Sequence, residues 1–288
     1  MNLDGIRAGA QQRAPVLVTL AAGLASISVL SLGPGSLTSQ ASARAHGVTA
    51  PGPNSVAPPR SPAVAAHRIQ LIGLGGGSDW GPANTLSAIE NGVAAGLDGV
   101  ELDVAFTADG LPVVFPDATL TAAPACTGPI WAVTLAQLSA CGLVGPRGAT
   151  TLDAVLSRLA PGRGRVYLYL TPGDDPTGAR RVVSLVDKYR LDDPNRLTVL
   201  ASDPRTLEQL RTAGARDLGF VFGDASGWTS PYRVLVARAS AASAAQIADA
   251  QRRGHFVIVA ADSRAALAQV TTLHPNGVMA HEVGALLR

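Results

Sequence analysis

Short runs of β-forming residues alternate with helical patterns from residue 68 to the end of the chain. Most of these runs precede a segment whose apolar residues recur at helical spacing, and strands that alternate with helices pair in parallel. Eight such units in about 220 residues match a (β/α)8 TIM barrel. An open, doubly wound sheet is the alternative fold. The eight runs are 68–73, 99–104, 165–170, 197–202, 218–223, 232–238, 255–261 and 277–281.

The N-terminus has the pattern of a secretory signal. Arg7 and Arg13 precede the uncharged apolar stretch 14–30, and Ala41-Ser42-Ala43 fits a cleavage site of the A-x-A type. We expect a signal peptide at 1–43, and an uncleaved membrane anchor is the alternative. A Pro- and Ala-rich disordered spacer is expected at 44–67 and the folded barrel at 68–288. Either reading places the barrel outside the cytoplasm, as a secreted or cell-envelope protein.

Two cysteines, Cys126 and Cys141, are the only ones in the chain. In an oxidising compartment such a pair indicates a disulfide, and closing a loop of this size stabilises a fold by about 3 kcal/mol. Two buried thiols are the alternative. A zinc site is poorly supported because no second Cys/His pair lies nearby.

Charge excludes one broad class of function. The formal net charge is +2, and Lys188 is the only lysine, so the basic residues are almost all arginines without a cluster. Nucleic-acid binding needs concentrated positive charge, and we do not expect a nucleic-acid partner. We expect a membrane contact only if the N-terminal segment stays uncleaved.

The stretch "VELDV" at 100–104 places two carboxylates on one face of a strand. Side chains alternate along a strand, so Glu101 and Asp103 point one way, while their apolar neighbours point toward the helices. Two carboxylates inside a barrel require a cation or hydrogen-bond donors, and closely spaced oxygen ligands suit Mg²⁺ or Ca²⁺. An arginine-paired or solvated pair at the rim is the alternative.

Residues 84–121 read "NTLSAIENGVAAGLDGVELDVAFTADGLPVVFPDATLT". This run resembles the glycerophosphodiester phosphodiesterase family, in which "PENT" leads through "IELDV" and "DG-x-PVV-x-HD". The resemblance extends weakly over most of residues 69–288 and is specific over about 84–120. It implies a TIM barrel of the phospholipase-C-like phosphodiesterase type. It also implies hydrolysis of glycerophosphodiesters with a carboxylate-bound divalent cation and two histidines that transfer protons.

The chain keeps some of the active-site residues that the resemblance implies. Glu101 and Asp103 match the metal-binding "E-x-D", Asn84 matches the end of "PENT", and Asp117 matches the Asp of "HD". The glutamate of "PENT" is replaced by Ala83.

Other positions depart from the family pattern. The first catalytic histidine and the phosphate-binding arginine after it align with Leu74 and Gly75, and the second histidine aligns with Pro116. A metal-binding glutamate and a lysine on the third strand align with Tyr169 and Thr171. Neither leucine nor proline transfers a proton, so the resemblance predicts a degenerate site, inactive or weakly active, with a weakened Mg²⁺ or Ca²⁺ site. The pocket is expected to hold a small phosphate ester, lined by Gly75, Gly76, Gly77, Asn84, Asp117, Tyr169 and Thr171.

Three other functions are considered for this chain. An active metal-dependent hydrolase would need substitute groups, and His281, at the C-terminal end of the last run, is the best but weak candidate. "GLGGGS" at 73–78 is similar to a dinucleotide-binding turn but lacks its third glycine, so no nucleotide cofactor is expected. A Ser-His-Asp hydrolase is weak because the chain has no G-x-S-x-G elbow.

Overall fold

The computed structural model describes residues 68–115, 119–123, 126–145, 148–171 and 176–287. All of them lie in the unit that ends at Arg288 and begins at Ser61. The expected signal peptide or anchor and the spacer lie outside the described residues, as do Pro116 and Asp117.

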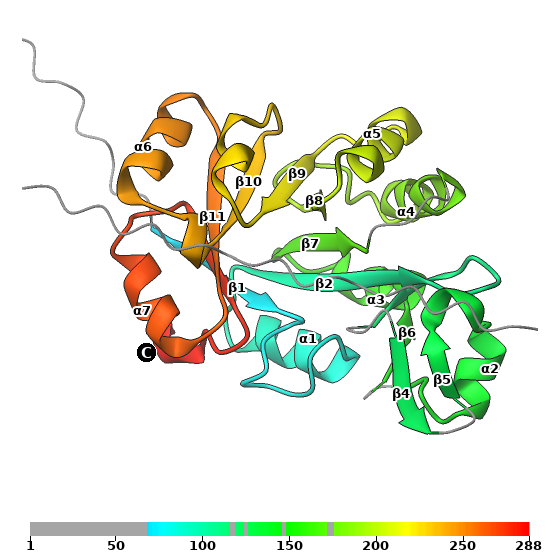
Figure 1. Ribbon diagram of the computed structural model, residues 1–288. Helices are drawn as coiled ribbons and strands as arrows, with labels where there is room; N and C mark the ends of the chain where they lie inside the picture. Colours follow the sequence, from blue (N-terminus) through cyan, green and yellow to red (C-terminus); the bar gives the residue numbers. More distant parts are fainter. Residues whose placement is uncertain (1–67, 116–118, 124–125, 146–147, 172–175, 288) are drawn as a thin grey trace, which may run out of the picture. The chain divides into compact units, whose positions relative to one another are not determined.

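Eight parallel strands close into a barrel (Figure 1). The last strand pairs with the first, and the first pairs with the second, so no open edge remains in the ring. This closure confirms the predicted TIM barrel and excludes the doubly wound sheet. In order around the ring, the strands are β1 (Gln70–Leu74), β2 (Gly99–Phe106), β7 (Arg165–Leu170), β8 (Leu197–Ala201), β9 (Leu218–Phe222), β10 (Val234–Arg238), β11 (Phe256–Ala261) and β12 (Gly277–Ala280).

Six helices surround the ring. Most begin at a residue whose side-chain oxygen accepts a hydrogen bond from the backbone N–H three positions on, as Thr85, Thr151 and Asp203 do. Each cap satisfies a backbone N–H at the start of the helix and so fixes the residue at which the helix begins. The helices are α1 (Leu86–Ala94), α3 (Leu152–Leu159), α4 (Pro176–Lys188), α5 (Pro204–Ala213), α6 (Ala244–Arg252) and α7 (Arg264–Thr271), with 3₁₀ turns η2 (Ala225–Thr229), η3 (Ala239–Ala241) and η4 (Gly284–Leu286).

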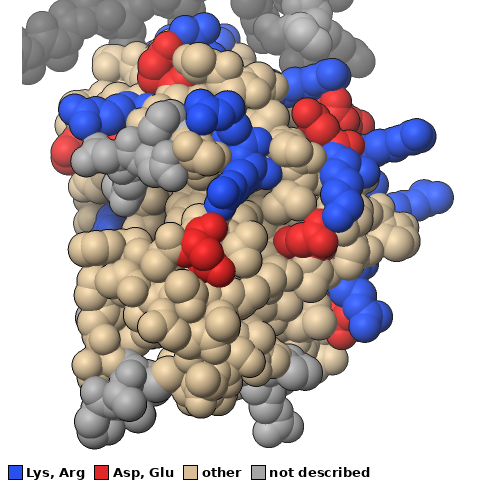
Figure 2. Space-filling model, turned by 90° about the vertical axis from the view of Figure 1, so that its right-hand side faces the viewer, with Lys and Arg blue, Asp and Glu red and all other residues tan. Residues whose placement is uncertain are grey.

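An insertion after β2 adds two antiparallel strands to the edge of β2 and a separate two-stranded sheet beside the barrel (Figure 1). Residues 118–146 of this segment contain no charged side chain, and Trp131 is 68% exposed. Figure 2 shows the result: Lys, Arg, Asp and Glu gather in the upper part of this face, and the lower part is largely uncharged. The elements are β3 (Pro112–Val114), β4 (Thr119–Ala123), β5 (Cys126–Pro129), η1 (Ile130–Ala132), α2 (Leu135–Ala140) and β6 (Thr150–Thr151).

The barrel has two apolar layers, one between the strands and the helices and one inside the ring. On β2, Val100, Leu102 and Val104 belong to the outer layer, so Glu101 and Asp103 face inward as the alternation predicts. The inner layer consists of Ile72, Tyr167, Leu200, Val234, Val236, Ile258 and Met279, with Leu74, Tyr169, Val221, Phe256 and Ala260 packed against it.

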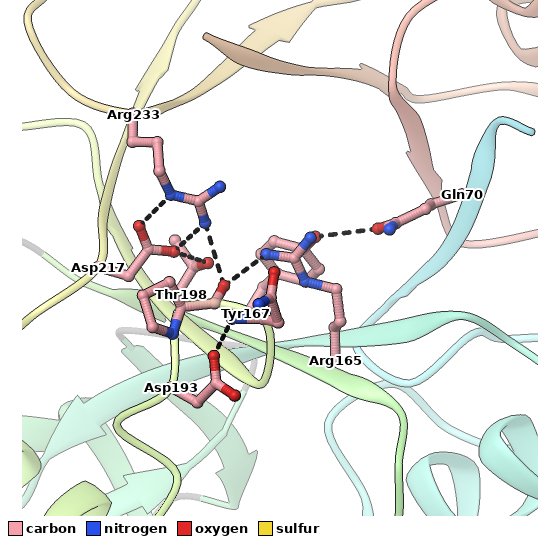
Figure 3. A network of polar contacts seen from close by, with 9 residues as sticks. Gln70, Arg165, Tyr167, Asp193, Thr198, Asp217 and Arg233 are labelled. Atoms are coloured by element: carbon pink, nitrogen blue, oxygen red, sulfur yellow. Dashed lines mark hydrogen bonds and ion pairs between the residues drawn. The ribbon is translucent and has the colours of Figure 1, made fainter. Parts of the chain in front are cut away.

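A polar network closes the N-terminal end of the ring (Figure 3). The buried Asp217 accepts hydrogen bonds from Arg233 Nε at 2.6 Å and from Thr198 Oγ1 at 2.6 Å. The Arg165 guanidinium lies over the rings of Tyr167 and Phe256 and donates to the Pro194 carbonyl at 2.7 Å. Burial raises the pKa of Tyr167 to about 12. TIM barrels place their functional groups at the opposite end of the ring, around the C-terminal ends of the strands, which we call the mouth.

Candidate ligand-binding site at the barrel mouth

The carboxylate pair on β2 lies at different depths. Glu101 is 4% exposed and accepts a hydrogen bond from the Gly75 N–H at 3.2 Å. Burial raises the pKa of Glu101 well above its ordinary value, the charge of Asp103 raises it further, and the Gly75 N–H partly opposes both. Glu101 therefore keeps its proton to a higher pH than a free glutamate does, and in that form it can donate a hydrogen bond.

Asn84 holds Asp103 by both ends of its amide. Its Nδ2 donates to Asp103 Oδ2 at 2.7 Å, and its Oδ1 accepts from the Asp103 backbone N–H at 2.8 Å. The Asn84 backbone has φ of 59°, a left-handed conformation that asparagine tolerates better than most residues. Asn84, which the sequence analysis expected in the pocket lining, thus contacts Asp103 in the structure.

The glycine run 75–77 packs against α1. All three glycines have positive φ, and a Cβ on Gly76 would lie 2.8 Å from the Ile89 nitrogen. A Cβ on Gly77 would lie 2.7 Å from the Trp80 ring. Gly76 thus lets the loop approach the helix, Gly77 leaves room for the Trp80 ring, and Gly75 turns its N–H toward Glu101.

The third and fourth strands of the ring add hydroxyl groups beside the carboxylates. Tyr169 is the register partner of Asp103, and its hydroxyl lies 2.9 Å from Ser202 Oγ. Thr171 follows the end of β7 and is partly exposed. Sequence reasoning selected Tyr169 and Thr171 but missed Ser202, which the alternation along β8 from the inward Leu200 places on the inner face.

The strand β12 brings His281 to the mouth. Met279 faces inward on β12, and His281 lies two positions later and is exposed. Its carbonyl accepts from the Ser78 N–H at 2.7 Å, which ties the end of β12 to the glycine loop. Leu74, at the end of β1, packs against the inner apolar layer.

One inward side chain at the mouth escaped the sequence reasoning. Arg238 ends β10, two positions after the inward Val236, and is exposed. The signal was present in the sequence, because an arginine closes the run 232–238 where an alternating strand points into the ring.

A sequence model of the glycerophosphoryl diester phosphodiesterase family matches residues 75–277, more than half of the chain. The chain belongs to the glycerophosphoryl diester phosphodiesterase family.

Relatives and solved structures of this family resemble the chain in different ways. Bovine glycerophosphodiester phosphodiesterase 1 is 42% identical over 71 residues, 25% of this chain and 22% of that protein. The uncharacterised Mycobacterium tuberculosis protein Rv2277c is 39% identical over 77 residues, 27% of this chain and 23% of that protein. The chain thus spans less than a quarter of the length of these curated relatives.

Solved structures of the family share the fold. A phosphodiesterase from Oleispira antarctica in complex with the product sn-glycerol-3-phosphate superposes with a TM-score of 0.65 at 20% identity, over 75% of this chain and 94% of that one. The glycerophosphodiester phosphodiesterase of Agrobacterium tumefaciens gives 0.64 at 19% identity, over 77% and 100%. At this identity the likeness establishes the barrel and no more.

Members of this family generally use a divalent metal such as Ca²⁺. Ca²⁺ takes six to eight oxygen ligands, and Mg²⁺ requires an octahedron of oxygens. Within the described residues no group of three or more acidic, histidine or cysteine side chains could hold a metal ion. One oxygen of Asp103 is bonded by Asn84 and one of Glu101 by Gly75. The described residues therefore do not fit a complete family metal site.

A hollow of about 660 Å³ lies outside the barrel, between α3, α4 and the start of β3. Its cations are Arg180, Arg181 and Lys188. Lys188 pairs with Asp153 at 2.6 Å, and Arg181 donates to the backbone carbonyls of the β2–β3 turn. We assign no ligand to this hollow.

Two further expectations concern the disulfide and the membrane anchor. Cys141 caps the C-terminus of α2, but the Cys126 side chain lies outside the described residues, so their disulfide stays a prediction. Among the described helices, none is both long and apolar enough to cross a bilayer.

Proposed function

We propose that this chain is an extracytoplasmic member of the glycerophosphoryl diester phosphodiesterase family that binds a small phosphate ester and hydrolyses it weakly or not at all. The observation that carries the proposal is the end of β1. Leu74 packs there against the inner apolar layer, and Gly75 follows it, at the positions that the resemblance assigns to a proton-transferring histidine and a phosphate-binding arginine. Neither residue can transfer a proton, so the carboxylates lack that partner.

The rest of the mouth supports binding. Asp103 is held rigidly by Asn84, and the hydroxyls of Tyr169 and Ser202 lie on the neighbouring strands. Carboxylate and hydroxyl oxygens accept hydrogen bonds from the hydroxyls of a glycerol moiety. The Oleispira antarctica relative binds sn-glycerol-3-phosphate on the same fold, which supports a ligand of this class.

An extracytoplasmic location is part of the proposal. It rests on the signal-like pattern of 1–43 and on the cysteine pair. N-terminal sequencing of the mature protein from cell-envelope and medium fractions tests it. A mature chain that begins near Arg44 supports a cleaved signal, and an intact N-terminus found only in the membrane fraction supports the anchor.

Catalysis and binding are tested on the same preparation. Purified full chain is incubated with glycerophosphocholine and with bis(p-nitrophenyl) phosphate, with Mg²⁺, Ca²⁺ or EDTA, and thermal unfolding is followed with sn-glycerol-3-phosphate. We expect a ligand-induced rise in Tm and no product above that of a mock purification. No shift at millimolar ligand would refute the binding proposal.

An active hydrolase is the second candidate. His281 favours it, because this imidazole lies at the mouth on the strand next to β1. Metal-dependent turnover that disappears in both Glu101→Gln and His281→Ala would establish it and overturn the inactive site.

A further inference from the structure

Arg238 is the one lysine or arginine that strand alternation turns into the mouth among the described strand ends. Val234 and Val236 of β10 belong to the inner layer, and Leu235 and Ala237 belong to the outer one. Arg238 continues this alternation on the inner face, and its register partner Ala260 on β11 also packs against the inner layer. The side chain therefore starts from the wall of the barrel and not from its outer surface.

The described part of the chain gives the Arg238 guanidinium no carboxylate. Three arginines outside the mouth are paired with carboxylates: Arg233 with Asp217, Arg264 with Glu282, and Arg211 with Glu208. The stem of Arg238 lies along Gly223 at the end of β9, where a Cβ would come within 3.2 Å of the Arg238 Cδ. Gly223 thus leaves room for the side chain.

Arg238 also faces the carboxylates across the ring. The strands run β2, β7, β8, β9, β10, so β10 is four strands from β2 in a ring of eight and lies opposite to it. Eight strands spaced by 4.8 Å and tilted by 36° give a ring about 15 Å wide. Along this half of the mouth the polar groups change from the acceptors on β2, through the Tyr169–Ser202 hydroxyl pair, to a guanidinium.

We propose that Arg238 forms a phosphate subsite on the β10 wall, so that a bound glycerol phosphate lies across the mouth with its phosphate at Arg238 and its hydroxyls at Asp103 and Glu101. This inference rests on the proposed function, which it deepens by naming the cation and the orientation of the ligand. Guanidinium groups bind phosphate through paired N–H···O bonds. A phosphate placed beside the β2 carboxylates would instead meet like charge.

The test is isothermal titration calorimetry of the full chain with three probes: sn-glycerol 3-phosphate, inorganic phosphate and glycerol. The variants are Arg238→Gln, Arg238→Lys and Asp103→Asn. Arg163→Gln serves as the matched control, because Arg163 is exposed just before β7, at the opposite end of the barrel. Thermal unfolding of each ligand-free variant verifies that it folds.

We expect Arg238→Gln to weaken sn-glycerol 3-phosphate at least tenfold, with Arg238→Lys restoring part of the affinity and Arg163→Gln matching the wild type. Asp103→Asn should weaken sn-glycerol 3-phosphate but not inorganic phosphate. Gly223→Val should also weaken both phosphate probes, since its side chain would occupy the place of the Arg238 stem.

The two proposals fail in different ways. Wild-type affinity in Arg238→Gln, with the wild type binding normally, would overturn the subsite and leave the proposed function standing. A loss of inorganic phosphate binding in Asp103→Asn would overturn the orientation. No binding of any probe by the wild type would overturn both proposals.

Discussion

Asn84 and Asp103 are joined by two hydrogen bonds, Nδ2 to Oδ2 at 2.7 Å and the Asp103 N–H to Oδ1 at 2.8 Å. This pairing fixes a carboxylate on β2 from the loop that precedes α1. The backbone of Asn84 is left-handed, so the residue contributes both a conformation and a pair of hydrogen bonds.

Two substitutions separate these contributions. Asn84→Gly keeps access to the left-handed backbone and removes the amide, and we expect it to lower the free energy of unfolding by about 1–3 kcal/mol. Asn84→Ala adds the backbone penalty of about 1 kcal/mol. The free energy of unfolding measured with urea should decrease from the wild type to Asn84→Gly and from Asn84→Gly to Asn84→Ala. An Ala variant as stable as the wild type would mean that the pairing does not hold the loop.

The buried Glu101 makes stability depend on pH. Because its pKa is raised in the folded state, the folded protein binds this proton more tightly than the unfolded chain. Below about pH 4 Glu101 is protonated in both states, so its titration does not lower the free energy of unfolding. As pH rises toward the pKa of Glu101 in the folded state, the free energy of unfolding falls. Glu101→Gln lacks this titration, so the variant should equal the wild type near pH 4 and exceed it at pH 8.

Urea unfolding at several pH values, with EDTA present, measures this difference. The subtraction of the two curves removes the titrating groups that do not interact with Glu101, and it leaves the coupled titration of Glu101 and Asp103. A variant that is less stable than the wild type at pH 8 would show that the ionised carboxylate is stabilised by contacts beyond Gly75.

Divalent cations should have little effect on the ligand-free protein. The described residues do not form a complete metal site, so millimolar Ca²⁺ or Mg²⁺ should raise Tm by less than about 1 °C. Differential scanning calorimetry with and without EDTA measures this. A rise of several degrees that is lost in Asp103→Asn would identify a functional site at the carboxylates.

The Asp217–Arg233 pair at the closed end supports the barrel. The Asp217 side chain is 3% exposed and that of Arg233 is 39% exposed. Removal of the arginine leaves a buried carboxylate without its cation, so Arg233→Met should cost about 2–3 kcal/mol, less than a fully buried pair would.

A double-mutant cycle isolates this pair. The double variant Arg233→Met, Asp217→Leu should be more stable than the sum of the single effects predicts, because no charge is then left unpaired. Strict additivity of the urea-derived values would argue that the two residues act independently. Binding of sn-glycerol 3-phosphate should be unchanged in every folded variant, since the pair lies at the far end of the ring from the mouth.

Gly92 of α1 tests the packing of the glycine loop. Alanine in a helix interior normally gains about 1 kcal/mol over glycine. A Cβ at Gly92 would lie 2.4 Å from the Gly76 carbonyl oxygen, so Gly92→Ala should be destabilising instead, by about 1–2 kcal/mol. Glu90→Ala, exposed on the same helix, is the control and should leave stability nearly unchanged. A more stable Gly92→Ala would contradict the close approach of loop and helix.

Local patterns in the sequence determined the architecture and one wall of the mouth. The eight β runs and the helical spacing between them predicted the barrel, and the period of two along "VELDV" predicted that Glu101 and Asp103 face inward. These features depend on residues that are close together in the sequence, so they can be predicted without a structure. The sequence predicted that the triple glycine lines the pocket, and it did not predict the contact of Gly76 with α1.

Only the tertiary structure decided which groups meet. Tyr169 and Ser202 are 33 positions apart, and Arg238 comes opposite Asp103 only because β12 pairs with β1 and β1 with β2. The physical reason is that contacts across a closed ring are set by strand order and register, which no local pattern of apolar and polar residues encodes.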